Sequence, residues 1–414
     1  MRIFYAAGAS PDAVIISESK LWEHNLFDSL VEMGHEVIPF SKDVTWHFTK
    51  YPSYRVSPIQ REKFLKYRSD LQTELIREIT TEYNKKKIDL FFSYFWSEIF
   101  EPETLEKIKS MGIKTVNWFC NASYQFHLIA ELAPHYDWCL VPEKFRLKDY
   151  AAIGARPIYC QEAANPNIYK PSDLPVEFDV VFVGQAYGDR SAYIKYLLDK
   201  GIDVRVWGSG WKRFSSLVRP NPHRRIPLQR ASNIGRKLLT AEGWQVVGRR
   251  LRNKLTTKPA NNNEQGLASA TRDEVFGLPD HILGGVLSDT EMIQMYSRVK
   301  INLGFSTCGE TQRTGERVTQ VRLRDFEVPM SGGFYMVEYM EELEEFFDIG
   351  REIVCYTGPE DLADKIKYYL RYESEREAIR EAGYERCRRD HTWRKRFDMA
   401  FKEMGLIQML DGVE

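Results

Sequence analysis

The sequence predicts an α/β fold made of two Rossmann-like, doubly wound halves that face a common cleft. Short apolar runs alternate with longer helical patterns along the chain, which is typical of parallel sheets with crossover helices. A stretch at 166–177 contains three prolines and interrupts this alternation, which restarts at Phe178. We therefore expect a first half over 1–165, a linker over 166–177 and a second half over 178–390.

The first half is expected to contain five strands separated by helices. A helix over 21–33 has Leu26, Leu30 and Met33 on one apolar face, and Gly34 ends it. The expected strands are 3–6, 36–40, 90–94, 115–118 and 138–141.

The second half repeats this plan with one interruption. Ser288 and Glu291 form a capping-box pattern that opens a helix. Between residues 209 and 279 the alternation fails, so we expect an insertion over about 212–280. The expected regular elements are strands at 178–183, 203–207, 300–305 and 334–337, with a helix at 191–200.

Composition excludes several classes of protein. The 414 residues are 43% hydrophobic, which indicates a globular chain with enough material for two or three domains. No stretch approaches the roughly 18 apolar residues that a membrane span needs, and the first residues are too short for a signal segment. The six cysteines include no Cys-x-x-Cys pair, so we expect a reduced cytoplasmic protein without a metal site.

The most informative motif is Arg322-Leu-Arg-Asp-Phe-Glu327-Val-Pro-Met-Ser-Gly332-Gly333, which an apolar strand follows. Two arginines and a glutamate open a helix and a glycine pair closes it, so acid, base and bare backbone are expected at one strand edge. The motif resembles the donor-sugar site of GT-B glycosyltransferases, in particular the CgeB-like branch related to glycosyltransferase family four. The resemblance implies that Glu327 accepts hydrogen bonds from the nucleotide ribose, because an ionised carboxylate matches a vicinal diol.

The resemblance implies that basic residues on either side of the expected insertion bind the donor diphosphate. Gly184 lies in a turn between a strand and a helix, where backbone N–H groups favour a phosphate, and Arg190 follows it. Arg322 and Arg324 are suited to bidentate contacts with phosphate oxygens. Arg190 and Arg324 are therefore the expected catalytic residues that stabilise the leaving diphosphate. Each position also fits an ordinary turn or surface charge.

Two further glycine turns are candidates for binding the nucleobase. Gly208, in Gly-Ser-Gly-Trp211, and Gly285 with Val286 both follow apolar runs and leave backbone groups available for the edge of a base. Trp211 either stacks on the base or sugar or packs in the core. The resemblance assigns Gly285 and Val286 to base recognition.

The sequence departs from the family pattern at Thr319, where the wider family four has a second glutamate. Either Glu310 or Glu316 replaces it, or this branch lacks the acid. The contact to the hydroxyls of the transferred sugar is the role in question. The departure leaves open a second hypothesis, a non-catalytic GT-B protein of binding or surface assembly, which a test for hydrolysis of nucleotide sugars would distinguish.

On the first half, His127 follows the run Trp118-Phe-Cys-Asn121 and is the candidate general base near the acceptor, although a lone histidine on a helix is also a common structural residue. The resemblance favours retention at the anomeric carbon, without a metal ion. It also implies a helix within 391–414 that crosses back to the first half.

The expected partners are a UDP- or GDP-sugar donor, with no permanently bound cofactor, and a glycan, lipid-linked or protein acceptor. Between Arg219 and Lys258 eleven Lys or Arg stand against one acid, although the net charge of the chain is −1. Residues 230–258 are typical of a basic amphipathic helix, which suits peripheral contact with an anionic membrane or simple packing on its own domain. Trp244 is the one aromatic residue of this segment, so nucleic acid is not expected as a partner.

Overall fold

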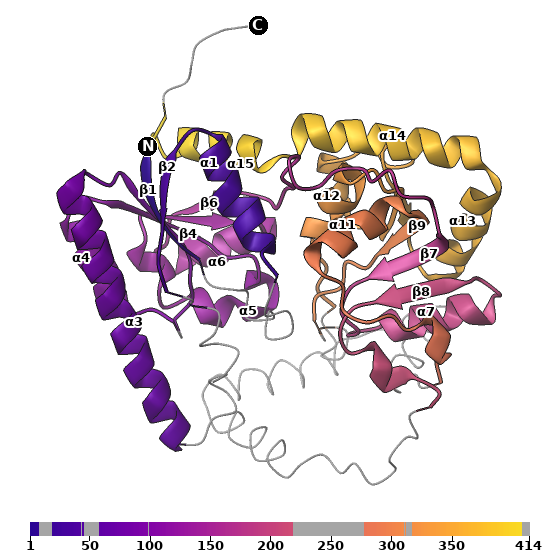
Figure 1. The fold of residues 1–414 in the computed structure, drawn as a ribbon, viewed down its shortest axis with the longest axis horizontal. Coiled ribbons are helices and arrows are strands. Elements are labelled where there is room, and N and C mark those ends of the chain that lie inside the picture. Colours follow the sequence, from indigo (N-terminus) through magenta and orange to yellow (C-terminus); the bar gives the residue numbers. More distant parts are fainter. Residues whose placement is uncertain are drawn as a thin grey trace, which may run out of the picture.

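A computed structural model describes residues 1–7, 19–42, 44, 58–97, 99–217, 277–309, 311 and 317–407. These residues form two parallel sheets in separate halves of the molecule (Figure 1). The predicted α/β architecture with two parallel sheets is therefore confirmed. Most of the expected insertion lies outside the described residues, as do the basic segment 230–258, Glu310 and Glu316.

The first sheet has six parallel strands in the order β2-β1-β3-β4-β5-β6. Its five predicted strands are present, and the sixth, β6, was not expected from the sequence. It is only three residues long and begins with a proline, so it has no hydrophobic alternation to reveal it. The strands are β1 (Arg2–Ala7), β2 (Glu36–Pro39), β3 (Leu90–Tyr94), β4 (Lys114–Trp118), β5 (Trp138–Val141) and β6 (Pro157–Tyr159).

The helix expected at 21–33 is divided in two. A π-helical turn, η2 (Glu23–Phe27), precedes α1 (Asp28–Glu32), and the wider turn places the polar side chain of Asn25 in the interior. The remaining helices of this half are α3 (Pro58–Lys85), α4 (Pro102–Ser110), α5 (Ala122–Ile129), η4 (Ala133–His135), η5 (Lys144–Arg146) and α6 (Leu147–Ala152).

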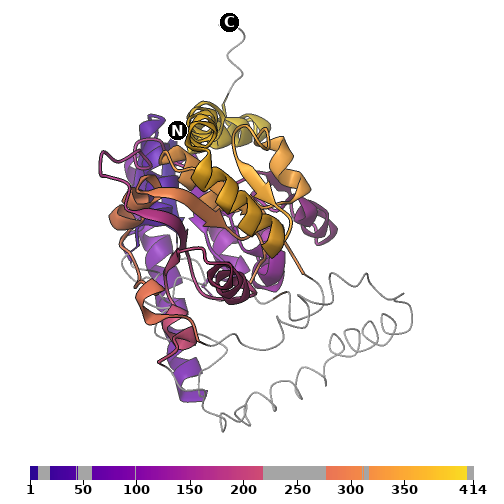
Figure 2. The ribbon, with the colours of Figure 1, turned by 90° about the vertical axis from the view of Figure 1, so that its right-hand side faces the viewer.

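The second sheet has five parallel strands in the order β11-β10-β9-β7-β8. They are β7 (Phe178–Val183), β8 (Val204–Trp207), β9 (Val299–Gly304), β10 (Tyr335–Glu338) and β11 (Val354–Tyr356). Helices accompany this sheet, as Figure 2 shows with this half turned toward the viewer. They are α7 (Arg190–Asp199), η6 (Trp211–Phe214), η7 (Asp280–Ile282), α11 (Asp289–Ser297), α12 (Leu323–Met330), η9 (Glu341–Glu345), α13 (Pro359–Arg371) and α14 (Glu373–Asp390).

Local signals explain where two of these helices begin. The capping box predicted at the start of α11 is present, because the Ser288 hydroxyl accepts a hydrogen bond from the N–H of Glu291 and the Glu291 carboxylate accepts one from the N–H of Ser288. Helix α7 begins at Arg190, directly after the glycine turn that follows β7. The side chain of Arg190 is therefore held at the carboxyl end of the second sheet.

The last helix, α15 (Trp393–Glu403), lies against the first half, whereas α14 before it covers the second half (Figure 1). Its apolar face is part of the core of the first sheet, with Trp393, Phe397 and Phe401 each 0% exposed. The ring of Phe397 contacts that of Phe92 edge-on, with centroids 5.8 Å apart. The chain thus returns to its first half after completing the second.

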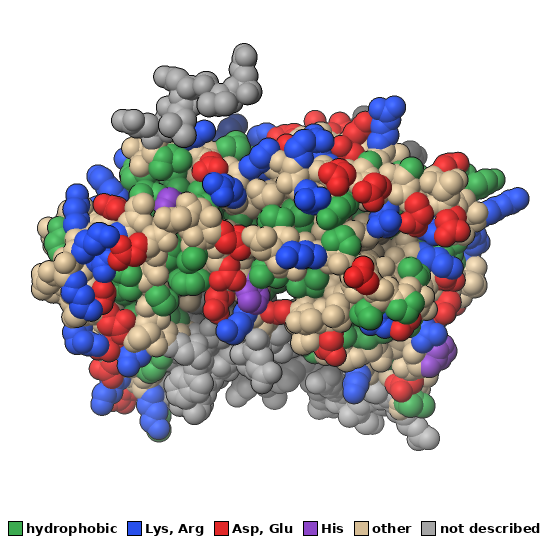
Figure 3. Space-filling view, turned by 45° about the horizontal axis from the view of Figure 1, so that its top comes forward, with side chains coloured by type: hydrophobic (Ala, Val, Ile, Leu, Met, Phe, Trp, Pro, Cys, Tyr) green, Lys and Arg blue, Asp and Glu red, His purple; other side chains and the backbone are tan. Residues whose placement is uncertain are grey.

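The molecular surface around these helices mixes charges of both signs. Figure 3 shows basic and acidic side chains next to one another on the face that includes α14 and α15, where Arg386 and Asp390 form an ion pair of 3.2 Å. Among the described helices, none combines the length and hydrophobicity needed to cross a membrane. All six cysteines are buried free thiols.

Candidate donor and acceptor site

The carboxyl ends of the two sheets face each other. The loop after β9 reaches the start of α5, which follows β4, so that a Cβ atom on Gly309 would lie 3.7 Å from the ring of Tyr124. In the same place the thiol of Cys308 adjoins the hydroxyl of Ser123. Residues that end strands in either half therefore meet in one region, which is where doubly wound folds bind ligands.

Three arginines from two segments, the start of α7 and the start of α12, surround Tyr187 on the side of the second half. Arg190 donates to the Tyr187 hydroxyl at 2.7 Å and stacks over its ring, with the guanidinium carbon 3.7 Å from the centroid. Arg322 donates to the carbonyl oxygens of Phe305, at 3.1 Å, and of Thr307. The guanidinium of Arg324 lies 5.6 Å from the ring centroid of Phe182.

The cluster of Arg190, Arg322 and Arg324, here called the arginine cluster, is buried. The nearby carboxylates of Asp189, Asp325 and Glu327 act on it without forming ion pairs. Burial, together with the other two arginines, lowers the pKa of Arg190 to about 10 although Tyr187 opposes this. Burial favours the neutral phenol of Tyr187, yet the three arginines outweigh it and lower the pKa of that group. Within the described residues the cluster forms no ion pair with a carboxylate; its hydrogen bonds to described residues go to carbonyl oxygens and to the hydroxyls of Tyr187 and Tyr296. Such a site favours a bound anion.

The loop at Gly184 forms the wall beside this cluster. A Cβ atom on Gly184 would lie 3.3 Å from Nη1 of Arg324, so the bare backbone lets the guanidinium approach. Gly208 packs on the loop from the next strand, because a Cβ there would lie 2.3 Å from the Gly184 carbonyl oxygen. The indole N–H of Trp211 donates to that same oxygen at 2.7 Å.

The position of Trp211 decides between the two roles that the sequence left open, stacking on a ligand and packing in the core. Its side chain is 0% exposed and packs edge-on against Phe182 in the core of the second half. No ring face is free to stack on a base or a sugar. Trp211 instead supports the Gly184 loop from the core side. The sequence could not decide this, because an aromatic residue after a glycine turn fits both a ligand contact and a core position.

The second glycine turn, at Gly285 and Val286, is exposed on one side. The N–H of Gly208 donates to the carbonyl of Gly285 at 2.9 Å, which ties the two turns together. Gly285 itself is exposed, with no atom within 4 Å of the place that a Cβ would occupy, and Val286 is 49% exposed. These two residues remain available to contact a planar ligand.

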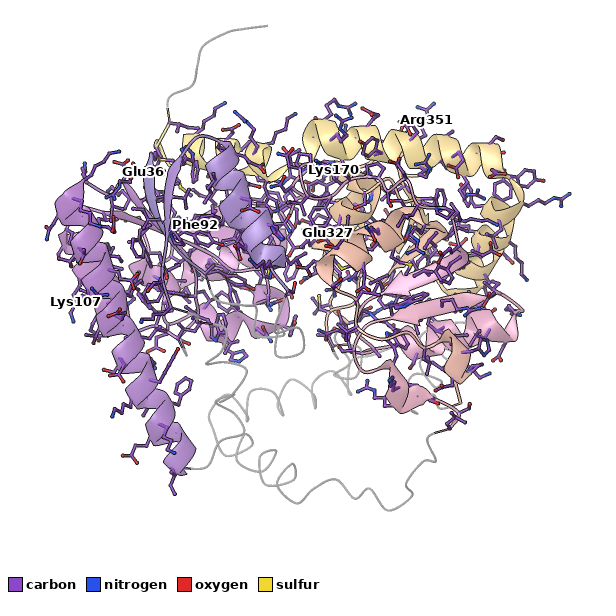
Figure 4. All side chains as sticks on the ribbon, viewed as in Figure 1. Glu36, Phe92, Lys107, Lys170, Glu327 and Arg351 are labelled. Carbon is purple, nitrogen blue, oxygen red and sulfur yellow. The ribbon has the colours of Figure 1, made fainter. Side chains whose placement is uncertain are left out.

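Glu327 lies on the side of α12 that faces the first half (Figure 4). Its carboxylate is buried and accepts a hydrogen bond of 2.5 Å from the hydroxyl of Tyr169, in the linker. Burial raises the pKa of Glu327 to about 7, against the hydrogen bond and the charge of Arg324. Tyr169 in turn accepts from Nδ2 of Asn25 at 3.0 Å, and Oδ1 of Asn25 accepts from the indole of Trp393 at 2.9 Å.

Gly332 and Gly333 do not lie beside the arginine cluster. They follow the far end of α12, whose eight residues separate them from Arg322 by roughly 12 Å at the usual helical rise. Gly332 has φ +72° and its carbonyl accepts from Arg380, while a Cβ on Gly333 would lie 2.7 Å from the carbonyl of Tyr296. The pair caps the helix and permits close packing, which corrects the expectation that its bare backbone binds the ligand.

Thr319 and Arg317 lie in a strand-like segment beside the loop after β9. Thr319, which stands where the resembled family has its second glutamate, pairs with Thr307 in an antiparallel bridge. Arg317 forms ion pairs with Asp189, at 3.1 Å, and with Glu338. It is therefore neutralised and does not add to the arginine cluster.

His127 is exposed in the last turn of α5 and forms no hydrogen bond with the described residues. Two buried acids that the sequence did not single out lie at the facing ends of the first sheet. They are Glu143, which follows β5 and is 3% exposed, and Glu162, which follows β6 and is 5% exposed. Isolated glutamates in loops give no sequence signal, and only the fold reveals that these are buried.

Metal ligands are absent from this region as far as the structure describes it. Across the described ranges no group of three or more His, Cys, Asp or Glu is arranged to hold a metal ion. Arginines supply the positive charge of the site.

Comparison with solved structures gives the fold. Sucrose-phosphate synthase from Thermosynechococcus elongatus superimposes with a TM-score of 0.53 at 10% identity, over 98% of this chain and 99% of that one. HepE from Anabaena, in complex with UDP and glucose, gives the same TM-score and identity over 98% and 100% of the two chains. The chain has the GT-B fold. HepE in complex with UDP-glucose is similar with a TM-score of 0.50 at 9% identity, over 98% of this chain and 100% of that one.

Comparison of sequences gives a match to part of the second half. Residues 252–401 match the family model described as glycosyl transferase-like. This match includes the whole of α12 and two members of the arginine cluster, Arg322 and Arg324. The search of curated proteins gave no match.

Proposed function

We propose that this GT-B protein is a glycosyltransferase that moves a sugar from a nucleotide-sugar donor to an acceptor hydroxyl. The observation that carries the proposal is the arginine cluster at the carboxyl end of the second sheet, which has no carboxylate partner among the described residues. A diphosphate would supply the anionic partner that the three guanidinium groups lack. The glycosyl transferase-like match over 252–401 and the GT-B fold support the same conclusion.

The parts of a nucleotide sugar fit the positions around the cluster. Arg190, Arg322, Arg324 and the Gly184 loop would bind the diphosphate, the exposed edge at Gly285 and Val286 the base, and Glu327 the ribose. HepE is similar in fold and binds UDP and UDP-glucose, which supports a UDP-sugar donor; a GDP-sugar is the second candidate.

Breaking the glycosidic bond leaves negative charge on the diphosphate, and pre-positioned guanidinium groups stabilise that charge as it develops. Because they neutralise it without a metal ion, we propose a metal-independent reaction. Within the class, the helix-opening motif favours the CgeB-like branch and transfer with retention.

The experiment measures UDP binding by calorimetry and UDP release from UDP-glucose, with GDP and GDP-glucose in parallel. We expect Arg324→Ala to lower turnover more than it weakens binding of uridine, because uridine lacks the diphosphate. Arg386→Ala is the matched control, because its guanidinium donates to the carbonyl of Phe346 from α14, away from the cluster. Failure of every nucleotide to bind would contradict the proposal.

A second candidate is a binding or assembly protein that uses a GT-B scaffold without catalysis. Thr319 at the position of the family's acid favours it. Binding of UDP-glucose without any release of UDP, with and without added acceptor sugars, would establish this alternative.

A further inference from the structure

The second side of the site holds two buried acids without a full set of partners. Glu143 Oε1 accepts a hydrogen bond of 3.1 Å from the N–H of Ser123, whereas Glu143 Oε2 is buried and has no partner. The Glu162 carboxylate forms no hydrogen bond or ion pair with the described residues, although only 5% of that residue is exposed. Buried polar groups are nearly always bonded, so Glu143 Oε2 needs a ligand.

The two acids face the arginine cluster across the boundary between the halves. The pKa of Glu162 is raised well above its usual range by burial and by Glu143, while the charge of Arg322 lowers it. Cys308, from the second half, lies near both groups, because the charge of Arg322 lowers the pKa of its thiol and that of Glu143 raises it. Glu143 and Glu162 therefore lie near the place where the diphosphate would bind.

We propose that Glu143 and Glu162 form the acceptor site, in which they bind hydroxyl groups of a neutral sugar and Glu143 Oε2 takes the proton of the attacking hydroxyl. The inference rests on the proposed function. Two adjoining carboxyl groups disfavour an anionic acceptor at this point, whereas hydroxyl groups donate the hydrogen bonds that unpartnered carboxylate oxygens accept.

The chemical step balances with these groups alone. The acceptor oxygen forms a bond to the anomeric carbon of the donor on the face from which the diphosphate leaves, so that the configuration is retained, and the bond from that carbon to the diphosphate oxygen breaks. The electron pair leaves with the diphosphate beside the arginine cluster. The acceptor proton passes to Glu143 Oε2, and Glu162 orients the acceptor through a second hydroxyl.

The local structure explains why Glu143 is suited to this role. It is the residue directly before the turn η5, and the N–H of Ser123 holds one carboxylate oxygen in place. Burial raises the pKa of Glu143 to about 7, which suits a group that receives a proton near neutral pH. His127 is on the same edge but exposed, so the structure favours Glu143 over the histidine that the sequence suggested.

The test compares Glu143→Gln with wild type, using UDP-glucose as donor and D-glucose as the acceptor probe. Glutamine keeps an oxygen that can accept from Ser123 but cannot take up a proton. We expect UDP affinity to stay within about twofold and UDP release to fall by at least about 100-fold, the usual contribution of a general base. Formate should partly restore turnover in Glu143→Ala, which a purely structural role would not allow.

Asp137→Asn is the matched control. Asp137 lies at the opposite end of β5 and accepts from the N–H of Thr115 at 2.8 Å, so its substitution changes a similar carboxylate on the same strand away from the site. We expect normal turnover for this variant. If Glu143→Gln releases UDP at the rate of wild type, the inference is wrong while UDP binding leaves the proposed function standing.

A binding measurement covers the case in which wild type releases no UDP. Binding of D-glucose to the UDP complex is then followed by saturation-transfer NMR in wild type, Glu143→Gln and Glu162→Gln. Weakening of at least tenfold in both variants supports the acceptor site. Equal binding in all three proteins, or no binding to wild type, overturns it. Failure of UDP itself to bind contradicts the proposed function instead.

Discussion

At the scale of single residues, Glu327 combines a buried carboxylate with one short hydrogen bond from Tyr169. Burial favours its protonated form and raises its pKa to about 7. Ribose hydroxyls donate to an ionised carboxylate, so a nucleotide and a proton compete for this group. As pH rises through 7 the Glu327 carboxylate ionises, and binding of the nucleotide therefore strengthens.

We predict that UDP affinity rises with pH between about 6 and 8, approaching tenfold per unit on the acid side, because one unit of pKa corresponds to about 1.4 kcal/mol. Glu327→Gln should remove this contribution and weaken binding at pH 8 by about 1.5 to 3 kcal/mol. Calorimetry over the pH series measures both effects. Glu352→Gln, in a carboxylate away from the site, is the control. An unchanged affinity in Glu327→Gln would remove the residue from the ribose site.

Residues of the site differ in how far the sequence reveals them. The arginines were recognisable because each stands next to a glycine turn or a helix start, and the fold brings all three around Tyr187. The partner of Glu327 was not recognisable, because Tyr169 is 158 positions away. Trp211 was ambiguous because an aromatic residue after a glycine turn fits both a ligand contact and a core position.

At the scale of elements, the turn after β8 is held against the Gly184 loop with no space for a side chain. Gly208 has φ +129°, and a Cβ there would lie 2.3 Å from the Gly184 carbonyl oxygen. The shape of the loop that faces the arginine cluster therefore depends on this glycine.

We predict that Gly208→Ala weakens UDP binding at least tenfold and lowers the melting temperature. Gly201→Ala is the matched control: Gly201 also has positive φ, at +75°, but no atom lies within 4 Å of its Cβ position. That variant should lose about 1 kcal/mol of stability from backbone strain alone and keep UDP affinity. Equal effects of the two substitutions on UDP affinity would show that contact with the Gly184 loop is unimportant.

Helix α15 gives a second test at this scale. Phe397 is 0% exposed in the core of the first sheet, whereas Met399 on the same helix is 66% exposed. We predict that Phe397→Ala lowers the free energy of unfolding by about 3 to 5 kcal/mol, through lost burial and a cavity. Met399→Ala should change it by less than about 0.5 kcal/mol. Denaturant unfolding of both variants measures the difference, and similar values would contradict the packing of this helix.

Elements were predictable wherever the chain repeats a clear period. Nine of the eleven described strands follow apolar runs that the sequence displays, and the capping box fixed the start of α11. Strands β6 and β11 were not predicted, because three residues are too few for a pattern. The π-helical turn at Glu23–Phe27 escaped because an ordinary helix has the same apolar residues.

At the scale of the whole molecule, contacts on both sides of the site join the two halves. Lys144 forms an ion pair of 2.7 Å with Glu345, and Tyr159 donates to Glu342 at 2.9 Å. The buried hydrogen bonds from Glu327 through Tyr169 to Asn25 connect the donor side to the first half. Such long-range pairings cannot be inferred from local patterns, whereas the presence of two halves can.

The basic segment 230–258 yields a prediction about where the protein acts. Each basic residue near an anionic surface contributes about 1 kcal/mol, so several of them produce measurable binding at low salt. We predict salt-sensitive binding to liposomes that contain phosphatidylserine, which neutral liposomes do not show. Deletion of 230–258 should abolish it. If the intact protein ignores anionic liposomes at low ionic strength, a soluble anionic acceptor or a structural insertion remains.

The return of α15 to the first half has a consequence for synthesis of the protein. Trp393 completes a core whose other members begin at Ile3, and its hydrogen bond to Asn25 spans 368 positions. A nascent chain emerges from its amino terminus, so the first sheet leaves the ribosome with a strip of its core uncovered. That strip stays open while the entire second half is translated, and chain segments exposed in this way are targets for chaperones. The half that is made first is therefore the half that finishes folding last.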